Sequence, residues 1–301
     1  MFENIIGNEK NKEILKKSIE KNKTSHSYIF YGTEGIGKKL IAKEIAKKIL
    51  CLKTELDDCN CKSCIEFETN NNPDFQLIEP IDEKIRIEQI RQMQRKVTEK
   101  PIISRNKVYI INNADTMTIE AQNSLLKTLE EPPEYITIIL ICTNDGNLLS
   151  TIKSRCTRMQ FENIKNEEIK EYLKKGLVER QISDNIIELS QGSIGKAIKL
   201  NEKREIYENI ENIFISMQTM DLIDIVKISE FIYKSKEEIQ SILEYINVLL
   251  IKLSKQNIIY IKCVEIVEET KRRLKANSNY DMSIDYMLFS IWQKIMGDNK
   301  T

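Results

Sequence analysis

Three glycines and a lysine in one short stretch have the spacing of a phosphate-binding loop. Gly32, Gly35 and Gly37 are followed directly by Lys38. An apolar run precedes them and an amphipathic run follows, which is the order of strand, loop and helix that this motif requires. In such a loop, backbone N–H groups and the helix N-terminus attract phosphate, and the lysine reaches its outer oxygens. The stretch therefore predicts a nucleotide cradle, with an ordinary glycine-rich turn as the alternative.

The residues that would hold Mg²⁺ beside this cradle have unsuitable side chains. Lys39 stands where the motif has a hydroxyl residue, and an ammonium group cannot ligate a cation. The later apolar strand is followed by Asn112 and Asn113, which lack the charge of the usual aspartate. Asp115 lies three residues beyond the expected place. Both changes remove the same function, so we expect no Mg²⁺ here, while ATP binding without metal stays open.

A cysteine cluster has the composition of a metal site. Four of the seven cysteines lie within fourteen residues, and the last two form a C-x-x-C pair. Four thiols at this spacing can surround one tetrahedral Zn²⁺, and no open coordination position is evident, so we expect a structural site. Free thiols in a loop and a redox pair are the alternatives. The predicted ligands are Cys51, Cys59, Cys61 and Cys64, whereas Cys142, Cys156 and Cys263 lie in apolar patterns and are expected in the core.

Composition limits the classes of protein to which the chain can belong. The 301 residues are enough for two or three domains. Lys and Arg together number 46, as do Asp and Glu, so no overall positive field favours nonspecific DNA binding. No apolar run approaches the ~20 residues of a membrane span, and the start lacks the pattern of a signal peptide. We expect a cytoplasmic protein.

The elements that must position these residues differ between the two halves of the chain. Short β-rich runs alternate with helical patterns in the first half, which predicts a parallel sheet with helical crossovers. From about Asn163 onward, apolar residues recur at helical spacing only. The predicted strands are 27–32, 75–80, 107–112, 136–143 and 157–162.

Further motifs give the chain a family resemblance. "SLLKTLEEPP" lies at 124–133 and "SRC" at 154–156, within a block that begins at the end of the predicted strand 107–112. Together with "FENIIGNEKNKEILKKSI" at 2–19, the phosphate loop and the cysteine cluster, this block resembles the clamp-loader ATPases of the AAA+ class. The resemblance covers the whole chain, although the helical tail carries no motif of its own.

The resemblance implies an α/β fold with three parts. An AAA+ P-loop domain with a five-stranded parallel sheet would occupy 1–162, with the zinc insert at about 51–64. An all-α lid at 163–205 and an all-α C-terminal collar at 206–301 would follow. The collar of such proteins joins gamma or tau subunits and delta into a ring, the clamp loader of bacterial DNA polymerase III. That ring places the sliding clamp on primed DNA.

Within that family, the degenerate nucleotide motifs are most similar to the stator subunit, which contributes an arginine to its neighbour's ATP site. The matching residue is Arg155, between Ser154 and Cys156. A guanidinium offers a planar set of donors suited to phosphate oxygens, although an isolated arginine is more often a solvated side chain. The lid turn agrees with a silent local site, because Gly195, followed by Lys196, stands where active members carry an arginine.

Two other functions compete with the stator. A self-sufficient ATPase of the gamma/tau type would need Asp115 or water in place of the missing ligands. A zinc-dependent DNA-binding adaptor is disfavoured by the zero net charge. We assign no chemistry to His26, expect the basic run at 271–275 to be a solvated face, and place Trp292 in the collar core or in a subunit contact.

Overall fold

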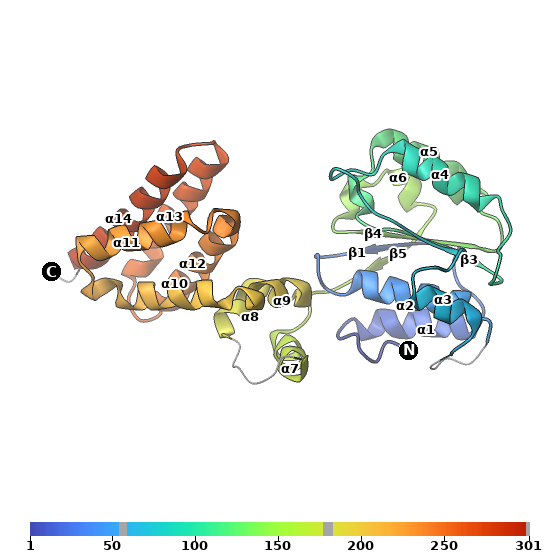
Figure 1. Cartoon of the computed structure of the whole chain (residues 1–301), viewed down its shortest axis with the longest axis horizontal. Coiled ribbons are helices and arrows are strands. Elements are labelled where there is room, and N and C mark those ends of the chain that lie inside the picture. Colours follow the sequence, from blue (N-terminus) through green and yellow to red (C-terminus); the bar gives the residue numbers. More distant parts are fainter. Residues whose placement is uncertain (54–58, 177–182, 299–301) are drawn as a thin grey trace. The chain divides into compact units, whose positions relative to one another are not determined.

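The computed structural model describes residues 1–53, 59–176 and 183–298 (Figure 1). The chain forms two compact units. The first comprises Met1–Tyr172 and Gly192–Lys196, and the second comprises Leu173–Gln191 and Ala197–Thr301. The predicted insert and the predicted lid both include positions outside the described residues. The division into three domains, with boundaries after residues 162 and 205, stays a prediction.

The first unit is built on a five-stranded sheet in which every strand pair is parallel, as predicted. The spatial order is β2-β3-β4-β1-β5, so the phosphate-loop strand β1 lies between β4 and β5. The strands are β1 (Ser27–Tyr31), β2 (Phe75–Ile78), β3 (Lys107–Ile111), β4 (Ile136–Cys142) and β5 (Thr157–Gln160). Every residue of β3 and β4 is buried, which is why these strands read as continuous apolar runs rather than alternating ones.

Helices cover both faces of this sheet. Figure 1 shows α1, α2 and α3 on one face and α4, α5 and α6 on the other. Their bounds are α1 (Glu9–Glu20), α2 (Lys38–Leu50), α3 (Lys62–Glu68), α4 (Ile87–Val97), α5 (Ile119–Glu130) and α6 (Ser150–Lys153), with short 3₁₀ turns η1 (Ala114–Thr116) and η2 (Asp145–Asn147). The core between the sheet and α4 and α5 includes Ile90, Met93, Leu125 and Ile138, all fully buried.

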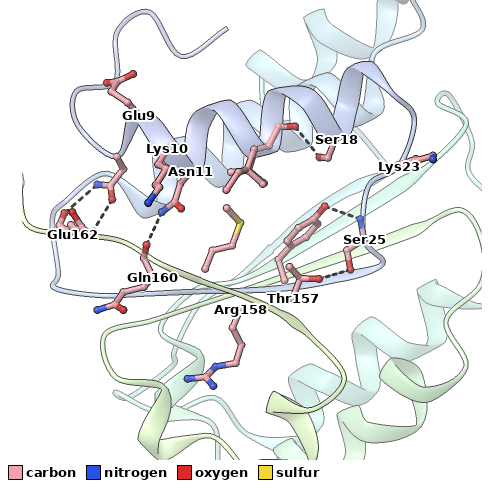
Figure 2. Close-up of a pocket in the computed structure, with 15 residues that line it drawn as sticks. Glu9, Lys10, Asn11, Ser18, Lys23, Ser25, Thr157, Arg158, Gln160 and Glu162 are labelled. Carbon is pink, nitrogen blue, oxygen red and sulfur yellow. Dashed lines mark hydrogen bonds between the residues drawn. The ribbon is translucent and has the colours of Figure 1, made fainter.

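Side-chain amides from the start of α1 bind the outer edge of β5, the last strand of the sheet. The Asn11 amide donates to the Gln160 carbonyl at 2.6 Å (Figure 2). The Asn8 amide donates to the Glu162 carbonyl at 3.2 Å, and its oxygen accepts from the Glu162 N–H at 2.8 Å. These contacts supply the partners that a sixth strand would otherwise provide.

The second unit is helical, as the apolar spacing predicted. Its helices are α8 (Asp184–Ser190), α10 (Arg204–Ser216), α11 (Leu222–Tyr233), α12 (Ile239–Leu253), α13 (Ile259–Lys275) and α14 (Tyr280–Asp298), with η3 (Met217–Thr219) and η4 (Lys236–Glu238). The helices α7 (Asn166–Gly176) and α9 (Ile194–Glu202) contribute residues to both units. None of the helices described is long and apolar enough to cross a bilayer.

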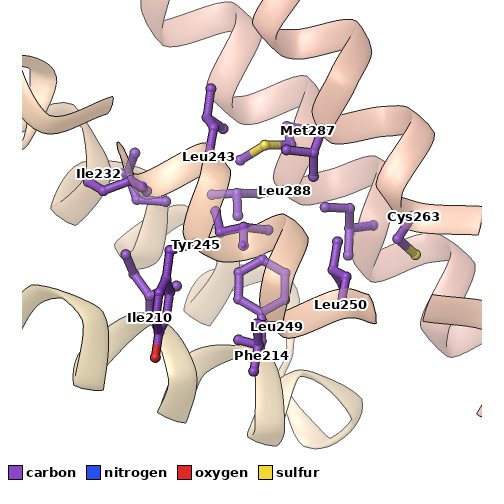
Figure 3. Close-up of a cluster of buried hydrophobic side chains, with 14 of the residues drawn as sticks. Ile210, Phe214, Ile232, Leu243, Tyr245, Leu249, Leu250, Cys263, Met287 and Leu288 are labelled. Carbon is purple, nitrogen blue, oxygen red and sulfur yellow. The ribbon is translucent and has the colours of Figure 1, made fainter. Parts of the chain in front are cut away.

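One continuous apolar core holds the second unit together (Figure 3). Helix α12 lies at its centre and buries Leu243, Leu249 and Leu250, which pack with residues of α10, α13 and α14. Trp292 packs against the edge of this core and donates from its indole N–H to the Met220 carbonyl at 3.1 Å. The tryptophan therefore lies at the edge of the core and is only partly buried, so a subunit contact stays the alternative prediction.

Candidate functional site

The predicted phosphate loop links β1 to α2, and its glycines have the backbone conformations that the motif requires. Gly32, Gly35 and Gly37 all have positive φ, at +143°, +76° and +94°. Residues with a side chain rarely adopt these backbone angles, so any residue other than glycine would strain the turn. Gly37 immediately precedes α2, whose first residue is Lys38. The structure therefore forms the strand, loop and helix arrangement from which the cradle was predicted.

The Lys38 ammonium is bonded within its own loop. It donates to the Gly32 carbonyl at 2.5 Å and to the Thr33 carbonyl at 2.6 Å, and the side chain is buried. Burial lowers the pKa of this ammonium, and the charges of Asp115 and Glu34 partly offset the effect. The lysine thus lies at the start of α2, as the motif requires, and loop carbonyls accept its hydrogen bonds.

A second glycine-containing segment lies directly on the loop. The Gly195 N–H donates to the Gly35 carbonyl at 3.0 Å. The backbones are so close that a Cβ on Gly195 would meet the Gly35 Cα at 3.0 Å, and a Cβ on Gly35 would meet the Ser193 hydroxyl oxygen at 2.3 Å. Gly195, predicted at the lid-arginine position, therefore permits a backbone contact that a side chain would obstruct.

Lys39, which the sequence places where the motif has a hydroxyl residue, forms an ion pair. The Lys39 ammonium lies 2.7 Å from a carboxylate oxygen of Glu79, the residue after β2. The Asn112 amide donates to the same oxygen at 3.1 Å. Lys39 and Asn112 together lower the pKa of Glu79, chiefly through the lysine hydrogen bond. Lys39 and Asn112, the two residues predicted to be unsuitable for Mg²⁺, thus bind the same Glu79 carboxylate, and the lysine neutralises its charge.

Asp115, the candidate replacement ligand, has partners at the end of β4. One of its carboxylate oxygens accepts from the Thr143 N–H at 3.0 Å, from the Thr143 hydroxyl at 2.5 Å and from the Asn144 N–H at 3.3 Å. The carboxylate thereby joins η1 to the segment after β4. In this arrangement its role is that of a structural acceptor.

Arg155 follows α6 and is fixed by several contacts. One terminal nitrogen lies 2.6 Å from a Glu130 carboxylate oxygen, and the other donates to the Thr151 carbonyl at 2.8 Å and to the Ser154 hydroxyl at 3.3 Å. A third of the side chain remains exposed. The structure therefore presents an ordered and accessible guanidinium at the predicted position.

The four predicted metal ligands come together. Their Sγ atoms all lie within 4.8 Å of one another, and Cys51 and Cys61 are 4.0 Å apart. Four sulfurs around a tetrahedral metal with bonds of about 2.3 Å would be about 3.8 Å apart, so this set can hold a structural metal. Burial opposes ionisation of Cys61, but hydrogen bonds from backbone N–H groups and neighbouring thiols outweigh it and lower its pKa to about 6. A thiolate is the form that binds metal.

A buried polar network anchors the cysteine cluster to the sheet. Ser63, beside the ligand Cys64, lies 2.8 Å from the Ser104 hydroxyl and accepts from the Asn72 amide at 2.9 Å. Ser104 also donates to the Leu50 carbonyl at 2.8 Å. The cluster is therefore attached to both the end of α2 and the loop before β3.

Sequence reasoning missed three acidic residues with specific roles. Glu79 and Glu130 pair with the two basic residues that the motifs identified. Asp74 is almost fully buried, and its carboxylate accepts backbone N–H groups of Ile102, Ile103 and Ser104, each at 2.7 Å. No motif marks Glu79 or Asp74, whereas Glu130 lies inside "SLLKTLEEPP" and its place there could have suggested a role.

Comparison with known proteins agrees with the resemblance. A model of the family described as "DNA polymerase III, delta subunit" matches residues 7–165, about half of the chain. DNA polymerase III subunit delta' of Bacillus subtilis is 34% identical over 201 residues, which cover 65% of this chain and 60% of that protein. Subunit gamma/tau of Mycoplasma genitalium is 34% identical over 233 residues, covering 74% of this chain and 39% of that protein.

The fold also matches a solved structure over nearly its full length. A DNA polymerase III gamma subunit-related protein of Thermotoga maritima superimposes with a TM-score of 0.52 at 21% identity, covering 94% of this chain and 99% of that one. This likeness concerns the fold alone. Together with the family match, it confirms an α/β AAA+ domain followed by a helical part. The chain therefore belongs to the DNA polymerase III delta-subunit family, as a clamp-loader subunit of the delta-prime type.

Proposed function

We propose that this chain is the stator of a DNA polymerase III clamp loader, largely inactive as an ATPase itself and supplying Arg155 to a neighbouring ATP site. In this role it assembles with gamma/tau and delta subunits, which together load a sliding clamp on primed DNA. The similarity to both delta' and gamma/tau proteins supports membership of such an assembly.

The observation that carries the proposal is the ion pair at the magnesium position. Mg²⁺ bridges the outer phosphates and neutralises developing charge in P-loop hydrolases. Here the Lys39 ammonium and the Asn112 amide both bind Glu79. A divalent cation brought to this point would be repelled by the lysine. The loop itself retains the positive φ angles of the motif, so nucleotide binding without hydrolysis stays compatible with the proposal.

Arg155 supports the second half of the proposal. An arginine provided by an adjoining subunit stabilises charge on the transferring phosphate and raises turnover by about 10³-fold to 10⁵-fold where such residues act. The guanidinium is ordered and partly exposed, as that role requires. No other residue of the "SRC" segment offers comparable chemistry.

The cysteine cluster supports a structural Zn²⁺. Four thiols with no carboxylate or imidazole ligand favour Zn²⁺ over Mg²⁺ or Ca²⁺, and the set is complete without an open position. Bound there, the metal would hold the segment after α2 against the start of α3. We expect one equivalent of zinc in the purified protein and its loss from the Cys61→Ser variant.

The role of Arg155 at the neighbouring ATP site is tested in the reconstituted complex. Arg155→Ala should lower clamp-stimulated ATP turnover at the adjoining site by about 10³-fold or more, because the transition-state charge loses its partner. Arg158→Ala is the matched control, since Arg158 lies on β5 and pairs with Asp145 of the same chain. Single-turnover hydrolysis measures both variants. Unchanged turnover in the Arg155→Ala complex would contradict the proposal.

The silent local site is tested on the isolated chain. We expect ATP hydrolysis no faster than background with Mg²⁺, and no further change in Lys38→Ala. Magnesium-dependent turnover that disappears in Lys38→Ala would instead establish the self-sufficient ATPase. That alternative has weaker support, because its replacement ligand Asp115 already binds Thr143 and Asn144.

A further inference from the structure

The Arg155 side chain is held at both ends of its guanidinium. Glu130 contacts one terminal nitrogen at 2.6 Å, and the Thr151 carbonyl accepts from the other at 2.8 Å. Thr151 belongs to α6 and Glu130 to α5, so two separate helices fix the plane of the group. One terminal nitrogen is thus satisfied by a charged partner and the other by neutral ones.

The backbone of Arg155 is fixed as well. Its N–H donates to the Ile152 carbonyl at 3.1 Å, and its carbonyl accepts from the Ser27 hydroxyl at 2.8 Å. Ser27 is a buried residue of β1, the strand between β4 and β5 that leads into the phosphate loop. Hydrogen bonds therefore fix the Arg155 backbone as well as its guanidinium. This indicates one defined side-chain rotamer rather than many solvated ones.

Glu130 occupies an unfavourable place for an acidic residue. It is the last residue of α5, and Pro132 and Pro133 follow shortly after the helix ends. Carbonyl groups at a helix C-terminus favour cations and disfavour carboxylates. The Arg155 guanidinium offsets this cost at Glu130. The next residue, Glu131, has no side-chain partner among the residues that the structure describes, which makes it a natural comparison.

We propose that Glu130 is a positioning residue for Arg155, which orders the guanidinium before the neighbouring ATP site is formed. The proposal rests on the proposed role of Arg155 in trans. A free arginine loses much rotamer freedom when it is ordered against a phosphate. With Glu130 on one terminal nitrogen and Thr151 on the other, that loss occurs on folding of this chain, and the N–H donors not used in these bonds can contact the neighbour's phosphate.

The first test compares two adjacent glutamates in the reconstituted complex. Glu130→Gln should lower kcat at the adjoining site by about twofold to fivefold, the factor corresponding to a partly exposed ion pair, with KM for ATP unchanged. Glu131→Gln, which has the same charge change one residue later, should leave both constants unchanged. Thermal unfolding of each variant shows that the fold is retained.

A double-mutant cycle separates positioning from a general structural role. On the Arg155→Ala background, Glu130→Gln should produce no further fall in kcat, because the group it positions is gone. If the fall is equally large with and without Arg155, Glu130 acts elsewhere and the proposal is overturned. A rise in kcat with Glu130→Gln alone would also overturn it, since the carboxylate would then restrain the arginine.

Failure of this inference and failure of the proposed function give different results. If Arg155→Ala lowers turnover but Glu130→Gln does not, only the positioning role is overturned. If Arg155→Ala itself has no effect, both are overturned. An NMR order parameter for the Arg155 guanidinium in the isolated chain gives a readout without the complex. It should fall in Glu130→Gln and stay unchanged in Glu131→Gln.

Discussion

Lys39 changes the phosphate site in two ways. It removes the hydroxyl that would ligate a metal, and it places a positive charge 2.7 Å from Glu79. A neutral replacement such as alanine would have removed only the ligand and left the carboxylate free to attract a cation. In the proposed function, the lysine therefore acts against a divalent ion by its charge as well as by the loss of a ligand.

The pair should make a small, pH-dependent contribution to stability. Lys39 holds the pKa of Glu79 below its usual value of about 4.3, so the pair stabilises the fold above that pH and the contribution is lost as the pH falls through the lower folded value. Because both side chains are more than a third exposed, Glu79→Gln should lower the free energy of unfolding by at most about 1 kcal/mol at pH 7. Urea denaturation at pH 7 and pH 3 measures it.

The control for this prediction is Glu83→Gln, because the exposed Glu83 side chain has no hydrogen bond or ion pair with the described residues. It should not reproduce the difference between the two pH values. An effect of Glu79→Gln that is equally large at pH 3 would show that the ion pair is not its source.

At the scale of elements, the phosphate loop and the turn that begins α9 act as one closely packed structure. Gly35 and Gly195 approach each other through their backbones, with a hydrogen bond of 3.0 Å between them. Both glycines are required there for different reasons. Gly35 has a positive φ, whereas a Cβ added to Gly195 would meet the backbone of Gly35.

Adding one methyl group at this contact should destabilise the protein. Gly35→Ala places a Cβ 2.3 Å from the Ser193 oxygen on a residue with φ of +76°, so we expect a loss of about 1–3 kcal/mol in the free energy of unfolding. The comparison is Gly297→Ala in α14, where an added Cβ meets nothing within 4 Å. Chemical denaturation of both variants gives the difference. Wild-type stability in Gly35→Ala would contradict the packing described.

The sequence predicted every strand of the sheet but extended each one by one or two residues. The predicted run 157–162, for example, corresponds to Thr157–Gln160. Apolar composition identifies a strand, whereas its end depends on where the partner strand stops pairing. The Phe161 N–H still donates to the Tyr31 carbonyl, and the Glu162 N–H donates to Asn8. Backbone hydrogen bonding therefore continues for two residues after the strand has ended.

The candidate site was predictable where motifs are local and not where partners are distant. The glycines, Lys38 and the cysteines follow from spacing along the chain, and Arg155 follows from the resemblance carried by the block around it. Glu79 is 40 positions from Lys39, and its role depends on β2 lying beside β3 in the sheet. Glu130 reaches Arg155 only because the end of α5 and the end of α6 meet in space. A single sequence does not supply those pairings.

At the scale of the whole molecule, the two units have separate cores. The cluster around Ile138 belongs to the sheet, and the cluster around Ile246 belongs to the helices. The residues Gly192–Lys196 group with the sheet although helical segments surround them in sequence. Composition along the sequence does not reveal that residues 192–196 group with the sheet, because this grouping depends on the packing of Gly195 on the phosphate loop.

Metal removal should therefore affect one unit selectively. Chelation, or Cys61→Ser, should lower amide hydrogen-exchange protection around α3 and the loop at 102–104, which the Ser63 and Ser104 contacts connect to the cluster. Protection in α12 should stay unchanged. Exchange measured by mass spectrometry tests this, with Cys263→Ala as a thiol control that keeps the metal. Equal loss of protection in both units would contradict the prediction.

The side-chain amides on β5 have a consequence for the behaviour of the protein at high concentration. An open sheet edge is a template on which another molecule can add a strand, and chains joined in this way aggregate. Asn8 and Asn11 already occupy hydrogen-bonding groups of Gln160 and Glu162 along that edge. Two short polar side chains thus make this edge of the sheet a poorer template for polymerisation.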